Sequence, residues 1–468
     1  MSLPPGFLVE LGPRTEVLDG GAALIGGSPT RLLRLSAKAR RALHGRRISA
    51  ATPVGAVLAD RLLEAGLADP VLDRLPDLDR LPDLDADHTV VVPIRDRAPQ
   101  LDRLLVALTA HTAPDRVVVV DDGSRRPAEL RRVAAAHGVR LVASRRNRGP
   151  AAARNLGLAH VETPFVVFAD SDVVLGPGAI PALLRHFQDP LVALVAPRIV
   201  PLDAGGGWVA RYEAARSSLD LGAEAASVRP GSRVGWVPST CLVGRVEALG
   251  AGFDAGMRVG EDVDLVWRLV AAGHRVRYEP AVAVAHEHRT GLRAFVATKF
   301  SYGTSAAALG ERHPEAIAPA VLAPWSAATM AALLAQRRWS LPVAAVATAI
   351  AARRIARRLD GVRRPGPVAL RLAGQGLVAA AGQTSALLLR HWWPATLVAA
   401  VCSRRVRTAA IVAAVADTAV EYVRLEPDLD PVRFGLLRRI DDLAYGAGVW
   451  WSAIRGRRFA ALRPVIRR

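Results

Sequence analysis

The feature that most constrains this chain is a regular alternation of short apolar runs and helix-like segments between residues 89 and 172. Buried strands are predicted for the runs Val90–Ile94, Arg116–Val120, Arg140–Val142 and Phe165–Phe168. Helices are predicted for the segments between them, Pro99–His111, Pro127–His137 and Gly149–His160. Strands and helices that alternate in this way form an α/β domain with a parallel sheet, which binds ligands at the carboxyl ends of its strands.

Two aspartates follow the fourth predicted strand. Asp170 and Asp172 are two residues apart, so in an extended segment both carboxylates lie on one face and can reach one hard cation. Such a pair would hold Mg²⁺ or Mn²⁺ together with phosphate oxygens of a substrate. The alternative interpretation is a solvated, Asp-rich loop.

A second acidic cluster, Asp121-Asp122-Gly123-Ser124, follows the second predicted strand. A carboxylate here can accept hydrogen bonds from a nucleobase or a ribose, and Gly123 lets the backbone approach a ligand closely. Arg154 follows in a helix whose amino-terminal end favours anions, so it can neutralise a phosphate or contact the base. The alternatives are an Asp that caps the helix near Pro127 and an Arg on an exposed helix face.

A third acidic pair, Glu261 and Asp262, follows a glycine-rich stretch and begins a predicted helix. One of these carboxylates could remove a proton from an attacking hydroxyl, although capping and the helix dipole alone also favour acids there. A later predicted strand ends at His286, whose imidazole could complete the ligand shell of a metal or have a structural role.

As an ordered set, these motifs resemble those of family 2 inverting glycosyltransferases, which have the GT-A fold. The resemblance covers roughly residues 89–304 and rests on Val92-Pro93, Asp121 through Ser124, Asn147 through Leu158, Asp170-Ser171-Asp172, Gly260-Glu261-Asp262 and Trp267-Arg268. The Q-x-x-R-W signature of processive synthases does not follow Asp262, which argues against a membrane channel that threads its own polymer.

The resemblance implies a nucleotide-sugar donor, usually UDP-linked, and a divalent metal. The metal ligands that it implies are Asp172, Asp170 and His286. The donor nucleotide-binding residues that it implies are Pro93, Asp121, Asp122, Arg154 and Asp170. Asp262 would be the general base, Glu261 would support it, and Trp267 would lie near the acceptor.

The remaining sequence divides at changes in composition. Residues 1–70 predict a small winged-helix-like module with a hairpin at Arg14–Gly27, which resembles the peptide-recognition domains of enzymes that modify ribosomally made peptides. Residues 71–88, where Asp-Arg-Leu-Pro-Asp-Leu occurs twice in succession, predict an acidic, proline-containing linker. We expect the GT-A domain at 89–305 and an Arg-rich helical region at 306–468.

The net charge of +19 is concentrated in this last region, where Arg337–Arg468 holds 23 arginines and 8 acidic residues. Arginines that flank long apolar runs fit a membrane surface better than a nucleic acid. Ala316–Gln336 is long enough for one span, although Pro319 and Pro324 weaken this interpretation. Leu372–Leu389 predicts a buried or packed helix. With two cysteines and no secretory signal, we expect a protein on the cytoplasmic side of the membrane, peripheral or with one or two spans. The alternative is a soluble helical bundle.

As a whole, the chain resembles the family of mycofactocin biosynthesis glycosyltransferases, which combine a short front module, a family 2 core and a hydrophobic Arg-rich tail. The resemblance implies glucose transfer from UDP-glucose onto a peptide-derived redox cofactor, building a short oligosaccharide. One alternative is a membrane-associated transferase of cell-envelope or lipid-linked sugars. Another is a non-catalytic nucleotide-sugar-binding protein, but the retained carboxylates of Asp170, Asp172, Glu261 and Asp262 argue against it.

Overall fold

A computed structural model describes residues 3–75, 87–203, 205–359 and 361–467. Packing divides the chain into unit 1, Met1–Asp203 with Ser217–His288, and unit 2, Ala204–Arg216 with Arg289–Arg468. This division differs from the expected boundaries, because it groups residues 205–216 and 289–305 with the C-terminal helices. Most of the repeated Asp-Arg-Leu-Pro-Asp-Leu segment lies outside the described residues.

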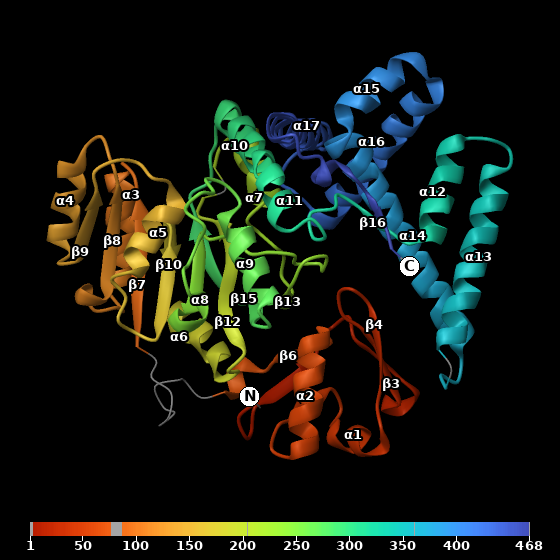
Figure 1. Ribbon diagram of the computed structural model, residues 1–468, viewed down its shortest axis with the longest axis horizontal. Coiled ribbons are helices and arrows are strands. Elements are labelled where there is room, and N and C mark those ends of the chain that lie inside the picture. The colour runs from red at the N-terminus through yellow and green to blue at the C-terminus, as the bar shows by residue number, and fades with distance from the viewer. Residues whose placement is uncertain (1–2, 76–86, 204, 360, 468) are drawn as a thin grey trace. The chain divides into compact units, whose positions relative to one another are not determined.

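The core of unit 1 is a mixed sheet whose first half is parallel (Figure 1). The strand order β9-β8-β7-β10 places side by side β7 (His88–Ile94), β8 (Val117–Asp122), β9 (Arg140–Ser144) and β10 (Phe165–Ala169). All four strands predicted from the sequence are confirmed. The helices that connect or follow them are α3 (Ala98–Thr109), α4 (Pro127–Ala136) and α5 (Pro150–Leu158).

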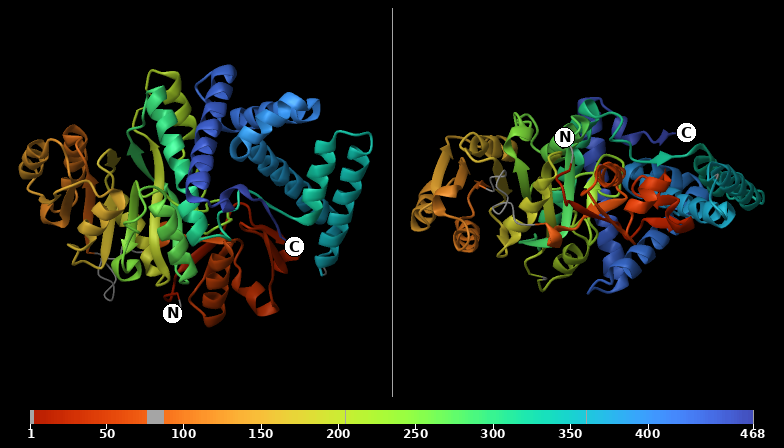
Figure 2. Two further views of the ribbon diagram at one scale, coloured as in Figure 1. Left: turned by 45° about the horizontal axis from the view of Figure 1, so that its top comes forward. Right: turned by 90° about the horizontal axis from the view of Figure 1, so that it is seen from below.

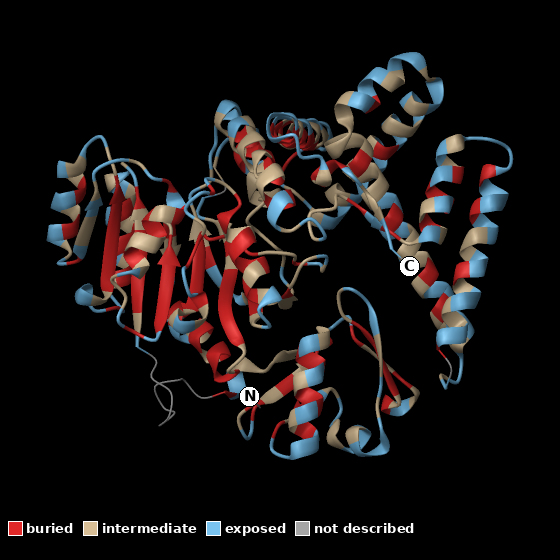
Figure 3. Ribbon diagram, viewed as in Figure 1, coloured by how far each residue is buried: buried red, intermediate tan, exposed pale blue. Residues whose placement is uncertain are grey.

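The second half of the sheet contains both antiparallel and parallel neighbours. From β10 the order continues through β14 (Cys241–Arg245), β12 (Val192–Pro201), β15 (Arg275–His286) and β11 (Val173–Leu175), with β13 (Ala226–Val228) also paired to β15. β14 runs antiparallel to both neighbours. The helices of this half are α6 (Ala179–Leu184), α8 (Val246–Leu249) and α9 (Glu261–Ala271). The central strands are almost entirely buried (Figure 3), as expected for a sheet with both faces covered.

The N-terminal module of unit 1 contains two small sheets and two helices. Its elements are β1 (Leu8–Leu11), β2 (Glu16–Leu18), β3 (Ala23–Gly26), β4 (Arg31–Arg34), α1 (Ala37–Ala42), β5 (Arg47–Ser49), α2 (Pro53–Ala65) and β6 (Ala68–Pro70). The predicted hairpin is confirmed, because β2 and β3 pair antiparallel. The strands of the other sheet have the order β5-β1-β6, and α2 packs against all three.

Unit 2 is mainly helical (Figure 2). Its helices are α7 (Trp208–Arg216), α10 (Leu292–Thr304), α11 (Ala306–Arg312), α12 (Pro324–Ala335), α13 (Ser340–Arg358), α14 (Pro365–Ala386), α15 (Trp393–Cys402), α16 (Arg404–Leu425) and α17 (Pro431–Gly456). Two short strands, β16 (Val321–Leu322) and β17 (Val465–Ile466), pair in parallel.

One expectation about the apolar runs of unit 2 is corrected. Ala316–Gln336 is not a continuous helix, because β16 interrupts it and α12 begins only at Pro324, where a proline is tolerated in the first turn. Leu372–Leu389 is helical and packs against α12, α13 and α16, so it is a packed helix rather than a buried one. It lies within the helical stretch Pro365–His391, of whose most apolar window only 17% is buried. Among the described residues, this stretch alone is both long and apolar enough to cross a membrane, by length and composition.

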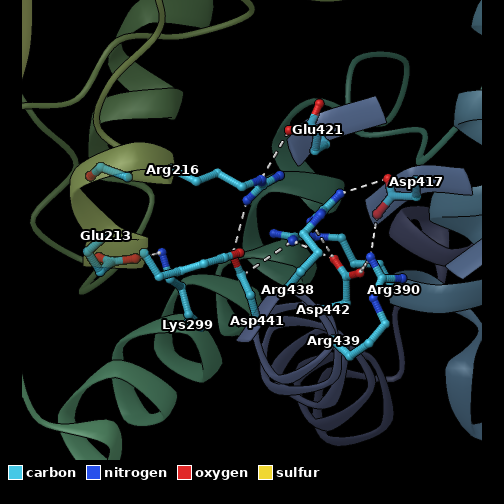
Figure 4. Close-up of polar contacts among 12 residues, drawn as sticks. Glu213, Arg216, Lys299, Arg390, Asp417, Glu421, Arg438, Arg439, Asp441 and Asp442 are labelled. Atoms are coloured by element: carbon cyan, nitrogen blue, oxygen red, sulfur yellow. Dashed lines mark hydrogen bonds and ion pairs between the residues drawn. The ribbon is translucent and has the colours of Figure 1, made fainter. Parts of the chain in front are cut away.

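A buried charge cluster surrounds α17 in unit 2 (Figure 4). Its members are equal numbers of basic and acidic side chains, Glu213, Arg216, Lys299, Arg390, Asp417, Glu421, Arg438, Arg439, Asp441 and Asp442. At its centre, the fully buried Asp441 accepts hydrogen bonds from Tyr212 at 3.2 Å and Arg216 at 3.1 Å. Burial alone would raise the pKa of Asp441, but Lys299, Arg390 and Arg216 hold it below its ordinary value. The paired charges therefore link α7, α10, α16 and α17 within one helical unit.

Candidate functional site

A buried arginine connects two of the predicted acidic groups. Arg154, on α5, donates from Nη2 to Asp170 Oδ1 at 2.7 Å and from Nη1 to Glu261 Oε1 at 3.1 Å. Its side chain is 3% exposed, and its guanidinium lies over the Phe253 ring, 5.4 Å from the centroid. The structure thus brings together the residue after β10, the centre of α5 and the first residue of α9. Arg154 is positioned to hold the two carboxylates rather than to lie free for a nucleotide.

Both carboxylates bound to Arg154 have shifted proton affinities. Desolvation raises the pKa of Asp170 to about 6, against the opposing effect of Arg154, and the nearby Asp172 adds to the rise. Desolvation likewise raises the pKa of Glu261 to about 6, where Asp262 adds to the rise and Arg154 opposes it. Groups whose pKa values are shifted toward neutrality by burial and by each other cluster at functional sites.

Asp262 lies at the start of α9, beside Glu261. Its Oδ2 accepts a hydrogen bond from the Ser239 backbone N–H at 3.2 Å, and its Oδ1 accepts from the Val263 N–H at 2.8 Å. Desolvation raises the pKa of Asp262, while these two backbone donors lower it. A half-buried carboxylate of raised pKa that is held in one orientation has the properties required of a general base.

The predicted metal site is built around Asp172. Asp172 Oδ1 lies 3.6 Å from His286 Nε2, while Arg97 donates to Asp172 Oδ2. His286 Nδ1 lies 3.1 Å from His288 Nδ1. Asp170, the other predicted ligand, is hydrogen-bonded to Arg154.

The side chains around Asp172 offer few donors to a divalent cation. Among the described residues, no three His, Cys, Asp or Glu side chains form a ready-made metal cluster. Asp172 and His286 nevertheless supply an oxygen and a nitrogen donor on adjacent strands, since β11 pairs with β15 in the register Val173↔His286. Two protein donors fit a cation that takes its remaining ligands from phosphate oxygens and water, as Mg²⁺ commonly does.

The predicted nucleotide-binding aspartates are occupied by backbone groups. Asp121 Oδ1 accepts from the Ser124 N–H at 2.8 Å, and Asp122 accepts from the backbone N–H groups of Arg148 and Gly149 at 2.7 and 2.8 Å. Asp122 therefore ties the loop after β8 to the loop before α5. Gly123 has a positive φ of 70°, and a Cβ there would lie 2.6 Å from the backbone of residues 146 and 147. This close approach is to the protein's own backbone, which corrects the expected reason for the glycine.

Two further predicted site residues have clear structural positions. Pro93 lies in β7, opposite Val120 of β8, and is therefore one residue from the Ile94–Asp121 pair. Trp267, on α9, is 7% exposed, and its Nε1 donates to the Gly235 carbonyl at 2.8 Å. A buried indole can act on an acceptor only through the segment that it holds, so its acceptor role stays a prediction.

Sequence reasoning missed three residues that organise the site. Arg97 pairs with Asp172, Ser239 donates to Asp262, and Asn155 makes a reciprocal pair of hydrogen bonds with the Phe253 backbone at 2.7 and 2.9 Å. Asn155 stood within the recognised motif after Arg154, so the motif itself was a signal. Arg97 and Ser239 had none, because this chain contains many arginines and a backbone donor has no residue signature.

The sequence has close relatives among known proteins. The model of the family Glycosyl transferase family 2 matches residues 89–250. The "Pre-mycofactocin glycosyltransferase" of Mycobacterium tuberculosis (strain CDC 1551 / Oshkosh) is 45% identical over 477 residues, covering 99% of each chain. The "Succinoglycan biosynthesis protein ExoU" of Rhizobium meliloti (strain 1021) is 30% identical over 175 residues, 34% of this chain and 50% of that protein.

Among solved structures, the chain is similar to the mannosyltransferase PcManGT from Pyrobaculum calidifontis, which was solved with GDP-Man and Mn²⁺. That structure covers 63% of this chain and 85% of its own, with 23% sequence identity and a TM-score of 0.38. The end-to-end relative, the matched domain and the sheet order agree with one another. The chain therefore belongs to the family of pre-mycofactocin glycosyltransferases and carries a family 2 glycosyltransferase domain with the GT-A fold.

Proposed function

We propose that this enzyme transfers glucose from UDP-glucose to a mycofactocin precursor, a small peptide-derived acceptor, and extends it to a short oligosaccharide. The observation that carries the proposal is the 45% identity over 99% of both chains to a relative described as a pre-mycofactocin glycosyltransferase. The geometry supports it, because a connected set of carboxylates lies at the carboxyl ends of β10 and at the start of α9.

Asp172 and His286 would hold a divalent metal, with Asp170 close enough to affect it. When bound, the metal would supply positive charge that stabilises the leaving diphosphate. In the same site, Arg154 balances the negative charges of Asp170 and Glu261, so that these two carboxylates can remain close together.

The proposed reaction is a single inverting displacement. Asp262 takes the proton of the acceptor hydroxyl, and the resulting oxygen nucleophile forms a bond to the anomeric carbon. The bond between that carbon and the diphosphate oxygen breaks, and its electron pair leaves with UDP. The proton stays on the Asp262 carboxylate until solvent removes it. The backbone N–H groups of Ser239 and Val263 hold the Asp262 carboxylate, and Glu261 would support the base from the adjacent position at the helix start.

The direct test is a transfer assay with Asp262→Asn. Removal of a general base costs roughly 10²–10⁴-fold in turnover, so we expect transfer to be almost abolished, while UDP binding by calorimetry stays close to that of the unaltered protein. Glu247→Gln, which changes an exposed carboxylate on α8, is the matched control and should retain activity. Near-normal turnover of Asp262→Asn, or equal loss of turnover and UDP binding, would contradict the assignment.

A second acceptor class is favoured by the surface of unit 2, where many large apolar side chains are exposed. A lipid-linked or cell-envelope sugar would be presented at a membrane. Parallel assays with the mycofactocin precursor and with lipid extracts separate these acceptors, because the enzyme should glycosylate only one class efficiently.

We also propose that unit 2 associates peripherally with the cytoplasmic membrane surface, with which its arginine-rich helices are compatible.

A further inference from the structure

Several of the contacts between the N-terminal module and the rest of unit 1 are made by one segment. Residues 222–239, here named the bridging segment, run from the end of a loop through β13 to the residue that donates to Asp262. Several module side chains contact this segment. Arg14 makes a two-pronged ion pair with Glu224, at 2.8 and 3.0 Å. Ser28 Oγ accepts a hydrogen bond from the Arg233 backbone N–H at 2.6 Å, and Arg229 donates to the Glu64 carbonyl.

Ser28 is presented by a tightly packed turn. Gly27 has a positive φ of 76°, and a Cβ on it would lie 2.6 Å from the Ala65 carbonyl oxygen at the end of α2. A Cβ on Gly26 would lie 2.9 Å from the Arg14 carbonyl oxygen. The Gly-Gly-Ser sequence therefore places the Ser28 hydroxyl against the module's own frame, where it meets the bridging segment.

The bridging segment is also folded upon itself. Arg233 donates to the carbonyls of Glu224 and Ala225 at 3.0 and 3.1 Å. Ser232 Oγ lies 2.8 and 2.7 Å from the carbonyl oxygens of Arg229 and Val234, either of which can accept its single proton. Because the segment is a hydrogen-bonded turn and not a free loop, contacts at Glu224 or Arg233 restrict the position of the whole turn.

The far end of the bridging segment contacts α9. The Gly235 carbonyl accepts from Trp267, and the Ser239 N–H donates to Asp262. The bridging segment thus makes hydrogen bonds both to Ser28 of the module and to residues of α9, the helix that begins with Glu261 and Asp262.

We propose that the N-terminal module is a positioning module for the transfer reaction, which holds the bridging segment so that Asp262 is kept in its reactive orientation. The inference rests on the proposed role of Asp262 and assigns no new catalytic residue. Arg14 and Ser28 are positioning residues, because they act on Asp262 through the bridging segment.

The test uses the full-length enzyme with UDP-glucose and the mycofactocin precursor. The double variant Arg14→Ala/Ser28→Ala removes two of the three described contacts to the bridging segment and leaves that of Arg229 with the Glu64 carbonyl. Loss of a hydrogen bond of this kind corresponds to roughly two- to ten-fold, so we expect kcat to fall about ten-fold while the dissociation constant of UDP changes less than about two-fold. Ser28→Thr in the presence of Arg14 keeps the hydroxyl and should retain kcat.

The matched control is Asp60→Asn. Asp60 also joins the module to the catalytic domain, through Arg275 at 2.6 Å, but Arg275 lies on β15 and not on the bridging segment. The control should leave kcat within about two-fold of the unaltered enzyme, because it removes a module contact that does not involve the bridging segment. Thermal melts show whether each variant is folded.

An unchanged kcat in the double variant would overturn the inference. An equal loss of kcat in Asp60→Asn would also overturn it, because the module would then only stabilise the fold. Asp262→Asn in the same assay separates the two hypotheses. If Asp262→Asn remains active, the assignment of Asp262 as the general base is wrong. If Asp262→Asn is inactive but the double variant is fully active, only the proposal of a positioning module is refuted.

Discussion

At the scale of single residues, Arg154 explains how several acidic side chains can share one buried region. Like charges brought together in a low-dielectric environment repel and raise one another's pKa. The guanidinium offsets this repulsion by pairing with Asp170 and Glu261. Burial would lower the pKa of Arg154, but its carboxylate partners raise it, so it stays charged at every pH of interest. Arg154 therefore keeps its positive charge, and the carboxylates are the groups of the site that change their protonation with pH.

The pH dependence of activity follows from Glu261 and Asp262. Desolvation raises the pKa of Glu261 to about 6 and that of Asp262 in the same direction. Because the Asp262 base acts only when it is ionised, we expect kcat/KM to fall on the acidic side at a pH above 3.8, the ordinary pKa of an aspartate. A pH–rate profile checks this expectation, and an acidic limb centred at or below pH 3.8 would contradict it.

The same shift affects stability with a definite sign. Between pH 4.5 and about 6, folded Glu261 keeps a proton that the unfolded chain has released. Its contribution to the free energy of unfolding therefore decreases as the pH rises through this window. Urea denaturation at the two ends of the window should show a smaller dependence on pH for Glu261→Gln than for the unaltered protein.

The pairing of Arg97 with Asp172 predicts competition with the metal. Arg97 occupies one oxygen of a proposed metal ligand, and its side chain is 41% exposed. An exposed ion pair contributes up to about 1 kcal/mol, so Arg97→Ala should tighten Mn²⁺ binding by up to about five-fold. Asp172→Ala should weaken it strongly. Calorimetric titration with Mn²⁺ measures both, and weaker binding by Arg97→Ala would show that the arginine assists the metal instead.

At the scale of elements, the close approach of α10 and α17 depends on two glycines in unit 2. A Cβ on Gly303 would lie 2.1 Å from the Tyr445 carbonyl oxygen, and a Cβ on Gly448 would lie 2.1 Å from the Phe300 carbonyl oxygen. The two backbones are therefore in direct contact. This contact keeps α17 near Lys299 of α10, which takes part in the buried charge cluster (Figure 4).

We expect Gly303→Ala to destabilise unit 2. The added methyl group must push the helices apart, and overpacking of this kind costs about 1–3 kcal/mol. Gly374→Ala on α14 is the control, because a Cβ there meets nothing within 4 Å and alanine favours the helix. Thermal melts should show a lower Tm for the first variant and an equal or higher Tm for the second. Equal stability of the two variants would contradict the close packing.

At the scale of the whole molecule, most of the large apolar side chains that are exposed in the described residues belong to unit 2. Exposed fractions reach 73% for Leu341, 59% for Val346 and 48% for Ile350 on α13 alone. The same helix ends with four arginines, at residues 353, 354, 357 and 358. Exposed apolar patches rimmed by charge mark protein or membrane contacts, and arginines favour anionic lipid headgroups.

The membrane proposal can be tested with vesicles. The enzyme should float with vesicles that contain anionic phosphatidylglycerol more than with neutral phosphatidylcholine vesicles, and less at high salt. Val346→Asp/Ile350→Asp should weaken this binding, because each charge must enter the apolar interface. Val106→Asp, at an equally exposed valine of α3 in unit 1, should have no effect. Binding that is lost equally in both variants, or absent throughout, would contradict the proposal.

The sequence by itself determined the α/β class, the four parallel strands and the acidic residues at their ends. These features depend on patterns of a few neighbouring residues: apolar runs, turn residues and the alternation of strand and helix. It left open whether Leu372–Leu389 is buried or only packed against its neighbours, since an apolar helix has the same composition in both cases. The tertiary structure alone decided the partners: Arg154 meets Glu261 across 107 residues, and Arg97 meets Asp172 across 75. Such pairs form only when distant segments pack together, so no local pattern records them.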